Sequence, residues 1–313
     1  MKRTTISELA PHQLGDVSRL CEQELTLDRC AGSIPRIVTR QPSLGLVAVR
    51  DYSTVGACIG SIALAGDASA EGFIELLVVD RAQQRRGIGT QLAAEMERQL
   101  AASGCQRINL SGNGPNNAWP GVDIHYTAAV CFAEDSGYQR YGCEVNMDID
   151  LPGALLDTRA DEDRLAAQGI EVRRADAADD GPLQESLGST WQPRWITEIT
   201  EALRSSEAGL HVAMQSGRCV GFCCYGVSRV HEVGPIGTHP DARRLGIGRV
   251  LLKRCLAEQR DLGIVTAELV WVGPLSYFSR AVHATIGRAF WLYTKDLSGA
   301  ARVPSWRDRI GLI

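Results

Sequence analysis

Two stretches of the chain share one pattern of apolar and polar positions. In each, an apolar run of strand length, at 74–80 and at 233–239, is followed by a short polar turn and by two glycines one residue apart. Apolar residues then recur at helical spacing, at Ile88, Leu92, Met96 and Leu100 in the first stretch and at Ile247, Val250, Leu251, Cys255 and Leu262 in the second. This periodicity predicts a strand, a glycine turn and an amphipathic helix in each stretch.

The similarity extends beyond these stretches and predicts a duplicated domain. Each copy has a pair of apolar runs that predicts a β-hairpin, at 46–49 and 55–62 in the first copy and at 211–214 and 220–225 in the second. The offset between the copies is larger from Val55 to Val220 than from Gly87 to Gly246. The first copy is therefore expected to carry a longer loop, around 66–71.

After its amphipathic helix, each copy continues with a glycine, a strand, a final helix and a last strand. An Asp-Leu pair closes each copy, at 150 and at 296. A further helix is expected within 28–40. The limits of the copies predict an N-terminal domain at 1–151, a linker at 152–169, a C-terminal domain at 170–298 and a tail at 299–313.

Composition excludes several classes of protein. The 313 residues are 44% hydrophobic and 22% charged, as in ordinary globular domains, and the net charge of −4 lacks the basic surplus of a nucleic-acid-binding protein. No apolar run reaches transmembrane length, and none follows the basic residues at the start, so we expect neither a membrane span nor a secretory signal. The ten cysteines form no Cys-x-x-Cys pair, which favours reduced thiols in a cytoplasmic protein over disulfides or a metal site.

The glycine turns suit a phosphate group. The first N–H groups of a helix have no partner within the helix, and the helix dipole favours negative charge beside them. Glycine lets backbone approach such an anion without a Cβ atom in the way. Neither turn continues as the Gly-Lys-Ser/Thr of a nucleotide-hydrolase loop. Neither is a dinucleotide fingerprint, because Leu92 and Leu251 stand where the third glycine is required.

What remains is a Gln/Arg-x-x-Gly-x-Gly pattern after a strand, at Gln84-Arg85-Arg86-Gly87-Ile88-Gly89 and at Arg243-Arg244-Leu245-Gly246-Ile247-Gly248. This pattern resembles the pyrophosphate-binding motif of the GNAT superfamily of N-acetyltransferases, and its duplication is similar to the arrangement of mycothiol synthases. The resemblance implies an α/β fold of two tandem GNAT-fold domains. Each would have a mixed central β-sheet with helices on both faces.

The resemblance also implies acetyl-CoA as co-substrate. We expect no metal, because the six histidines have no spacing that suggests a metal site. In the family the glycine loop holds the pyrophosphate of coenzyme A, and the preceding strand offers backbone groups to the pantetheine arm. In the first copy the matching positions are Leu77, Val78, Val79, Gln84, Arg85, Arg86, Gly87, Ile88, Gly89 and Thr90. In the second they are Ile236, Gly237, Thr238, Arg243, Arg244, Leu245, Gly246, Ile247, Gly248 and Arg249.

Acetyl transfer to an amine uses a base, and backbone N–H groups that polarise the thioester carbonyl. Glu232 stands fourteen residues before the first glycine of the second motif, as the base does in the family's histone acetyltransferases. The Gly234-Pro235 pair after it predicts a β-bulge, because proline cannot donate to a sheet. Two interpretations of Glu232 fit the sequence, a catalytic base in a cleft and a solvated residue at a strand end. In the first copy the same spacing gives Phe73, so Glu75 is the weaker candidate.

The family's general acid, a tyrosine, has no direct match. It usually stands four residues before the glycine that ends the last helix, and these positions hold Ala133 and Ser279. Tyr277 is the catalytic candidate in the second copy. It would serve only from a distorted helix, and otherwise it is a packed aromatic residue. Without a phenol, water can protonate the leaving thiolate.

Together these observations predict an acyl-CoA-dependent N-acetyltransferase that moves an acetyl group to the primary amine of a small molecule by direct transfer. The second copy is the expected catalytic one, through Glu232. The alternative is a non-catalytic coenzyme A-binding module. A polar loop at 113–126 is either an acceptor site or a solvent loop. We expect no nucleic-acid or membrane partner, and a monomer or homodimer.

Overall fold

The computed structural model describes residues 4–28, 43–64, 70–112, 114–117, 119–187, 191 and 193–297. The helix expected within 28–40, most of the loop expected at 66–71 and the tail expected at 299–313 lie outside these residues. The first half of the chain contains β1 (Thr5–Glu8), α1 (Leu14–Glu24), β2 (Ser43–Arg50), β3 (Ser53–Leu64), β4 (Ala70–Val79), α3 (Ile88–Ala102), β5 (Arg107–Leu110), β6 (Val122–Asp123), α4 (Thr127–Asp135) and β7 (Gln139–Asp150). The second half contains α5 (Arg159–Ala166), β8 (Ile170–Arg174), α6 (Asp180–Leu187), α7 (Pro193–Arg204), β9 (Gly209–Gln215), β10 (Arg218–Tyr225), β11 (Glu232–Thr238), α8 (Ile247–Asp261), β12 (Thr266–Leu269), α9 (Leu275–Val282) and β13 (Thr285–Asp296).

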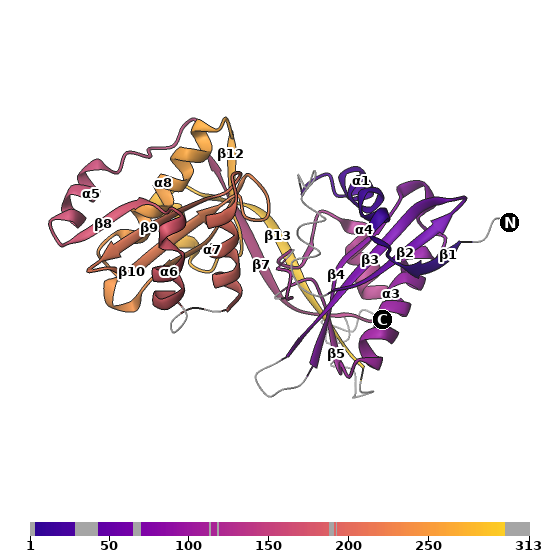
Figure 1. The fold of residues 1–313 in the computed structure, drawn as a ribbon. Helices are drawn as coiled ribbons and strands as arrows, with labels where there is room; N and C mark the ends of the chain where they lie inside the picture. The colour runs from indigo at the N-terminus through magenta and orange to yellow at the C-terminus, as the bar shows by residue number, and fades with distance from the viewer. Residues whose placement is uncertain are drawn as a thin grey trace. The chain divides into compact units, whose positions relative to one another are not determined.

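These elements form two compact units with the same sheet topology (Figure 1). The first unit runs to Glu144 and resumes at Arg288, and the second comprises Val145–Gly287. The strand order is β1-β2-β3-β4-β5-β13 in the first unit and β8-β9-β10-β11-β12-β7 in the second. The pairs β4–β5 and β11–β12 are parallel, whereas the other neighbours in these orders are antiparallel. Each unit therefore has the mixed sheet that the sequence predicted.

The last strand of each unit differs from the sequence prediction. Residues 293–296 of β13 pair with β5 in the first unit, and residues 147–150 of β7 pair with β12 in the second. The sequence prediction placed β7 in the domain at 1–151 and β13 in the domain at 170–298. The two strands have similar length and both end in Asp-Leu, so the sequence pattern does not distinguish their neighbours. The linker predicted at 152–169 also contains a helix, α5.

Helices cover both faces of the first unit's sheet (Figure 1). On one face α3 packs through the predicted apolar stripe, and none of its members is more than 3% exposed: Ile88, Leu92, Met96 and Leu100. On the other face α1 packs through Val17, Leu20 and Cys21. Successive strand residues such as Leu46 and Val47 belong to opposite cores, because side chains alternate along a strand. Each fully buried aliphatic side chain contributes about 1.5–3 kcal/mol.

The second unit repeats this arrangement. Helix α8 covers one face through Ile247, Val250, Leu251 and Cys255. Helices α6 and α7 cover the other, through Leu183, Leu187, Ile199 and Ala202. In β10, Cys223 faces the α8 side and Phe222 the α6–α7 side. The two-sided core predicted for each copy is confirmed.

The hairpin turns of the two units also match. Asp51 and Tyr52, between β2 and β3, have φ of 52° and 64°. Ser216 and Gly217, between β9 and β10, have φ of 50° and 78°. Two left-handed residues in succession are typical of a two-residue type I′ hairpin turn. The two turns are offset along the chain by the same amount as Val55 and Val220, which agrees with the alignment of the copies in the sequence.

The nine cysteines among the described residues are all free thiols. Burial raises the pKa of the Cys58 and Cys224 thiols, so these groups stay protonated at neutral pH. In the described parts of the chain, no helix combines the length and the apolarity needed to cross a membrane.

Candidate active site

The two glycine loops have the same left-handed backbone. Arg85 and Gly87 have φ of 59° and 78°, and Arg244 and Gly246 have φ of 67° and 88°. Gly87 and Gly246 immediately precede α3 and α8, and no side chain caps either helix there. The first N–H groups of each helix are therefore open to a ligand. An anion would bind beside them with support from the helix dipole.

One side chain ties each loop to the strand before it. Gln84 Nε2 donates to the carbonyl of Val79 at 2.9 Å, and Arg243 Nε donates to the carbonyl of Thr238 at 3.5 Å. The two donors occupy equivalent positions in the two copies, and so do the two acceptors. Their offset along the chain equals the offset between Gly87 and Gly246. Strand end and loop are thus held together, so a ligand lying along the strand meets the loop in a fixed geometry.

A cavity of about 500 Å³ lies beside the first loop. Its walls come from β4, the loop, the end of β5 and α4, through Ile74, Glu75, Leu77, Val79, Gln84, Arg85, Gly87, Ile88, Gly89, Thr90, Leu110, Ser111, Val122, Ala128, Ala129 and Phe132. The cavity therefore joins the predicted anion site to the middle of β4, where Glu75 lies.

Glu75 is the extra residue of a β-bulge. Between Ile59 and Gly60 the register of β3 against β4 shifts by one residue, from Leu76 to Ile74, so that the register skips Glu75. The residue is buried, with 3% of its surface exposed. Oε1 accepts hydrogen bonds from Ser61 Oγ and, at 3.2 Å each, from the backbone N and Nδ2 of Asn116. The bulge thus presents a carboxylate that the fold itself holds in place.

An equivalent bulge lies in β11. Between Cys223 and Tyr225 the register of β10 against β11 shifts at Gly234-Pro235. Gly234 has a φ of 146°, and the bond to Pro235 is cis. The bulge predicted from this proline is confirmed. Gly234 follows Glu75 by the same offset that separates the two glycine loops, so the two bulges occupy the same place in the two units.

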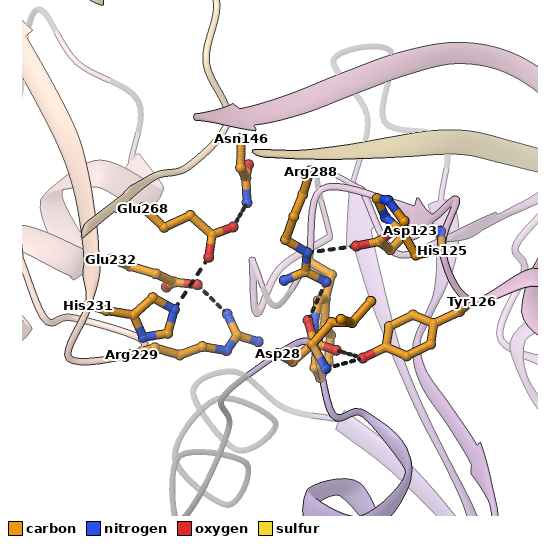
Figure 2. Close-up of polar contacts among 12 residues, drawn as sticks. Asp28, Asp123, His125, Tyr126, Asn146, Arg229, His231, Glu232, Glu268 and Arg288 are labelled. Carbon is orange, nitrogen blue, oxygen red and sulfur yellow. Dashed lines mark hydrogen bonds and ion pairs between the residues drawn. The ribbon is translucent and has the colours of Figure 1, made fainter. Parts of the chain in front are cut away.

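Glu232 begins β11 and belongs to a buried polar group of the second unit (Figure 2). It is 8% exposed, and its Oε1 accepts a hydrogen bond from Arg229 Nη1 at 2.5 Å. Glu268, its register partner on β12, lies with Oε2 3.3 Å from His231 Nε2. Asn146 Nδ2 donates to the other oxygen of Glu268 at 2.6 Å. Glu232 is therefore a buried and paired carboxylate and not a solvated strand-end residue.

A second cavity, of about 600 Å³, lies beside the second loop. It is lined by Asp161, Arg164, Thr238, Ala242, Arg243, Arg244, Leu245, Gly246, Ile247, Gly248, Arg249 and Tyr277. Glu232 is not part of this lining. The second cavity thus lies at the anion end of the predicted site, whereas the first also reaches the bulge.

Tyr277 faces the second loop from α9. Its hydroxyl lies 2.9 Å from where a Cβ atom would stand at Gly248, and its ring packs edge-on against Phe278 at 5.0 Å between centroids. Burial, with a smaller contribution from Cys223, raises the pKa of Tyr277 to about 12. The phenol is therefore protonated at neutral pH. Tyr277 reaches the cavity from α9, an eight-residue α-helix. The distorted helix that we expected to be necessary for this position is therefore not needed.

The predicted cofactor residues fall into two sets, those that line one of the two cavities and those that line neither. Most of them belong to the first set. The residues outside both linings are Val78, Arg86, Ile236 and Gly237. The Val78 side chain packs in the core on the α1 side, so only its backbone is available to a ligand. A Cβ atom at Gly237 would lie 2.6 Å from the Trp191 ring, so this strand position admits no side chain.

The sequence prediction missed three charged residues of the second unit. Arg229, three residues before Glu232, pairs with it, whereas Asp161 and Arg164 line the second cavity from α5. The charged stretch that contains α5 was interpreted as linker. A signal was present, because Thr158 precedes two acidic residues in a first helical turn and Arg164 falls in the last.

The described part of the polar loop before α4 is a buried network (Figure 2). Asp28, 1% exposed, accepts hydrogen bonds from Trp119 Nε1 and Tyr126 Oη at 2.9 Å each and from Arg288 Nη2 at 2.7 Å. Arg288 Nε donates to Asp123 at 2.6 Å. These bonds fix α4 beside the first cavity, so this part of the loop is not a plain solvent loop.

Metal ligation was not expected from the sequence. Within the described ranges, no three His, Cys, Asp or Glu side chains are grouped so that they could hold a metal ion.

Comparison with known proteins gives matches in both units. The model of the acetyltransferase (GNAT) family matches residues 11–119 and 178–287. A mycothiol acetyltransferase from Geodermatophilus obscurus is 29% identical over 218 residues, which are 64% of this chain and 63% of that protein. The chain thus aligns with less than two thirds of this relative's length.

Several solved structures share the fold. A tandem GNAT protein from the clavulanic acid biosynthesis pathway has a TM-score of 0.65 at 15% identity and covers 96% of this chain and 100% of its own. The glucosamine N-acetyltransferase region of a fungal β-N-acetylglucosaminidase has a TM-score of 0.74 at 18% identity, over 94% of this chain and 38% of that one. A GCN5-related N-acetyltransferase from Sphaerobacter thermophilus has a TM-score of 0.60 at 16% identity, over 96% and 98%.

Proposed function

Because the chain belongs to the acetyltransferase (GNAT) family, we propose that it is an N-acetyltransferase and transfers an acetyl group from coenzyme A directly to the primary amine of a small molecule. Acetyl-CoA binds at both glycine loops in this proposal, and the second unit carries out catalysis. Family membership favours this activity over a coenzyme A-binding module without catalysis.

The observation that carries the proposal is the course of the first cavity. It joins the glycine loop, which offers N–H groups to a pyrophosphate, to the bulge at Glu75. A bulge turns backbone N–H groups of the strand away from the regular ladder, a geometry in which N–H groups can bind a thioester carbonyl. The same loop and the same bulge recur in the second unit, at Gly246 and at Gly234-Pro235. The backbone features that support this proposal therefore recur in both units.

We propose Glu232 as the general base. Among the described residues, its Oε1 accepts one hydrogen bond, from Arg229, whereas Oε1 of Glu75 already accepts three from Ser61 and Asn116. Glu232 takes a proton from the substrate ammonium group, directly or through water. The neutral nitrogen then attacks the thioester carbon and loses its second proton to water, and the C–S bond breaks with release of the coenzyme A thiolate.

We propose Tyr277 as the acid that protonates this thiolate. Its phenol lines the second cavity beside Gly248, and burial keeps it in the protonated form. After donation, the phenolate recovers a proton from solvent. Arg249, which also lines the cavity, stabilises the phenolate because its charge lowers the pKa of Tyr277.

A small amine is proposed as acceptor for two reasons. Two buried carboxylates, Glu232 and Glu268, lie on neighbouring strands and favour a cationic ammonium group. In addition, the relative from Geodermatophilus obscurus is named mycothiol acetyltransferase, and not for a protein acceptor.

The proposal is tested with purified protein, acetyl-CoA and a panel of primary amines. The panel should contain amino sugars, amino-acid amides and short lysine peptides, and release of the coenzyme A thiol is the readout. We expect amine-dependent release with at least one small amine, and an acetylated amine in the product. Release with peptides alone would contradict the small-molecule acceptor, and no release with any amine would contradict the activity.

A further inference from the structure

Helix α5 is firmly anchored beside the second glycine loop. Its Leu165 is 0% exposed and belongs to the core on the α8 side. Its Glu162 accepts two hydrogen bonds from Arg254 of α8, one of them from Nε at 2.9 Å. These contacts fix the rotation of α5 about its axis, and thereby the side on which its other charged residues lie.

On that side, Asp161 lies between two arginines. Both carboxylate oxygens of Asp161 are 2.9 Å from Arg249 Nη2, and Oδ1 is also 3.2 Å from Arg164 Nη2. The same Nη2 of Arg164 lies 3.0 Å from where a Cβ atom would stand at Gly246, the first glycine of the loop. The Asp161 carboxylate thus occupies a position in which two guanidinium groups already converge on an oxyanion.

The first loop has a different surrounding. Among the described residues that line the first cavity, Glu75 carries the carboxylate, and it lies at the bulge. Arg85 is the charged residue that the first loop contributes to this lining. The second lining contains Asp161 and the four arginines Arg164, Arg243, Arg244 and Arg249. The two loops share a backbone but differ in the charges around it.

We propose that Arg164 and Arg249 bind a phosphate group of coenzyme A in the second unit, and that Asp161 holds their position and competes with that phosphate. The inference rests on the proposed binding of coenzyme A at both loops. It adds a ligand-binding residue from α5, a helix outside the part of the chain that the family model matches. Coenzyme A must displace the carboxylate of Asp161, so the second site binds it more weakly than it would without this side chain.

The competition persists across the working pH range. Burial by itself raises the pKa of Asp161, but hydrogen bonds from Arg164 and the charge of Arg249 outweigh it and lower the pKa below its usual value. Asp161 therefore stays ionised at neutral pH. The groups that face its carboxylate are these two arginines, from α5 and α8.

The Arg164 arm of the test uses calorimetry with coenzyme A. The Gly87→Glu substitution blocks the first loop, so the heat of binding that remains reports the second loop. Loss of this heat in the Gly87→Glu/Gly246→Glu chain verifies the assignment. In the Gly87→Glu background, Arg164→Gln should weaken binding of coenzyme A about five- to tenfold. The effect is smaller than for a fully buried charged hydrogen bond because Arg164 is partly exposed. Arg159→Gln is the matched control, since Arg159 lies on the same helix, pairs with Asp157 and does not line the cavity.

The Asp161 arm of the test has the opposite sign. Asp161→Asn should strengthen binding of coenzyme A at the second loop by about three- to tenfold, because a neutral side chain cannot compete for the guanidinium groups. Asp157→Asn is its control, with the same change of charge near the start of the helix.

Three outcomes would overturn the inference. These are unchanged affinity in Arg164→Gln, equal effects of a variant and its control, and no binding at the second loop with or without Asp161→Asn. Each is measured as binding. Turnover with acetyl-CoA and amines in the unmodified chain tests the proposed function separately, so that the two can fail independently.

Discussion

Gly87 and Gly246 hold the same left-handed conformation, with φ of 78° and 88°, at the residue before α3 and before α8. A side chain at either position strains the backbone and projects toward the anion site. At Gly87 the nearest atom to an added Cβ is Gln91 Nε2 at 3.7 Å, and at Gly246 it is Arg164 Nη2 at 3.0 Å. Substitution should therefore act on ligand binding at both loops through one mechanism.

Two coenzyme A molecules are expected to bind per chain. Gly87→Glu and Gly246→Glu should each remove one site, because bulk and negative charge then stand against the pyrophosphate. Isothermal titration calorimetry with coenzyme A gives the stoichiometry. Gly104→Glu is the control: Gly104 is also left-handed, with φ of 90° and open space around it, but it follows α3 at the far end from the loop. One site or none in the unmodified chain would contradict the claim that both loops bind.

The features that local sequence dictates were predictable. Positive φ at Gly87, the apolar stripe of α3 and the bulge at Gly234-Pro235 depend on residues next to one another in the chain. The exchange of β7 and β13 depends instead on which strand pairs with β12 and which with β5. These partners are distant in the chain, and the sequence patterns of β7 and β13 are compatible with either of them. A one-dimensional repeat contains no information on that choice.

The candidate site divides in the same way. The glycine loops and Glu232 were found from spacing, whereas the partners of Glu232 were not, because Arg229 and His231 carry no motif. Asp161 reaches the second cavity only because Leu165 and Glu162 anchor α5. That placement results from tertiary packing, which spacing along the chain cannot predict.

The second unit should lose stability in acid through Glu258. Burial raises the pKa of this carboxyl, but His211 at 3.0 Å and the Arg174 charge outweigh burial and lower the pKa from 4.5 to about 2. The folded chain thus binds fewer protons than the unfolded chain, so the stabilisation is complete above about pH 4.5 and is lost as the pH falls toward 2. Glu258→Gln should cost about 2 kcal/mol at pH 7, allowing for partial exposure.

Urea unfolding at several pH values measures this effect. The difference between the unmodified chain and Glu258→Gln should shrink below about pH 4.5, where the native pair begins to lose its advantage. Glu95→Gln is the comparison, since Glu95 pairs with Arg98 on an exposed helix face and should have no measurable effect. A difference between the chains that stays constant down to pH 3 would contradict the assigned role of Glu258.

Tyr277→Phe should lower turnover about ten- to a hundredfold, less than a full acid contribution because water can protonate the thiolate. Coenzyme A affinity should change little, since the substitution keeps the ring against Phe278. Because the pKa of Tyr277 is about 12, turnover in the unmodified chain should show no loss from its deprotonation between pH 7 and 10. Tyr225→Phe is the control; that phenol binds Glu258 at 3.0 Å and should not affect turnover. Equal effects of the two variants would remove Tyr277 from the mechanism.

Catalysis is assigned to the second unit through Glu232. An ammonium substrate near neutral pH must lose a proton before it attacks, and general-base contributions are typically ~10²–10⁴-fold, so Glu232→Gln should lower turnover at pH 7 by about that factor. Coenzyme A binding should persist, because Glu232 lies outside the lining of the second cavity.

The pH dependence separates a catalytic loss from a structural one. As the pH rises and more amine is neutral in solution, the deficit of Glu232→Gln should shrink, whereas damage to the buried pair with Arg229 would persist at every pH. Glu75→Gln is the matched variant, since it changes a buried carboxylate beside the bulge of the first unit in the same way. It should leave turnover largely intact. If Glu75→Gln abolishes turnover and Glu232→Gln does not, the first unit is the catalytic one, and its cavity from glycine loop to bulge is the active site.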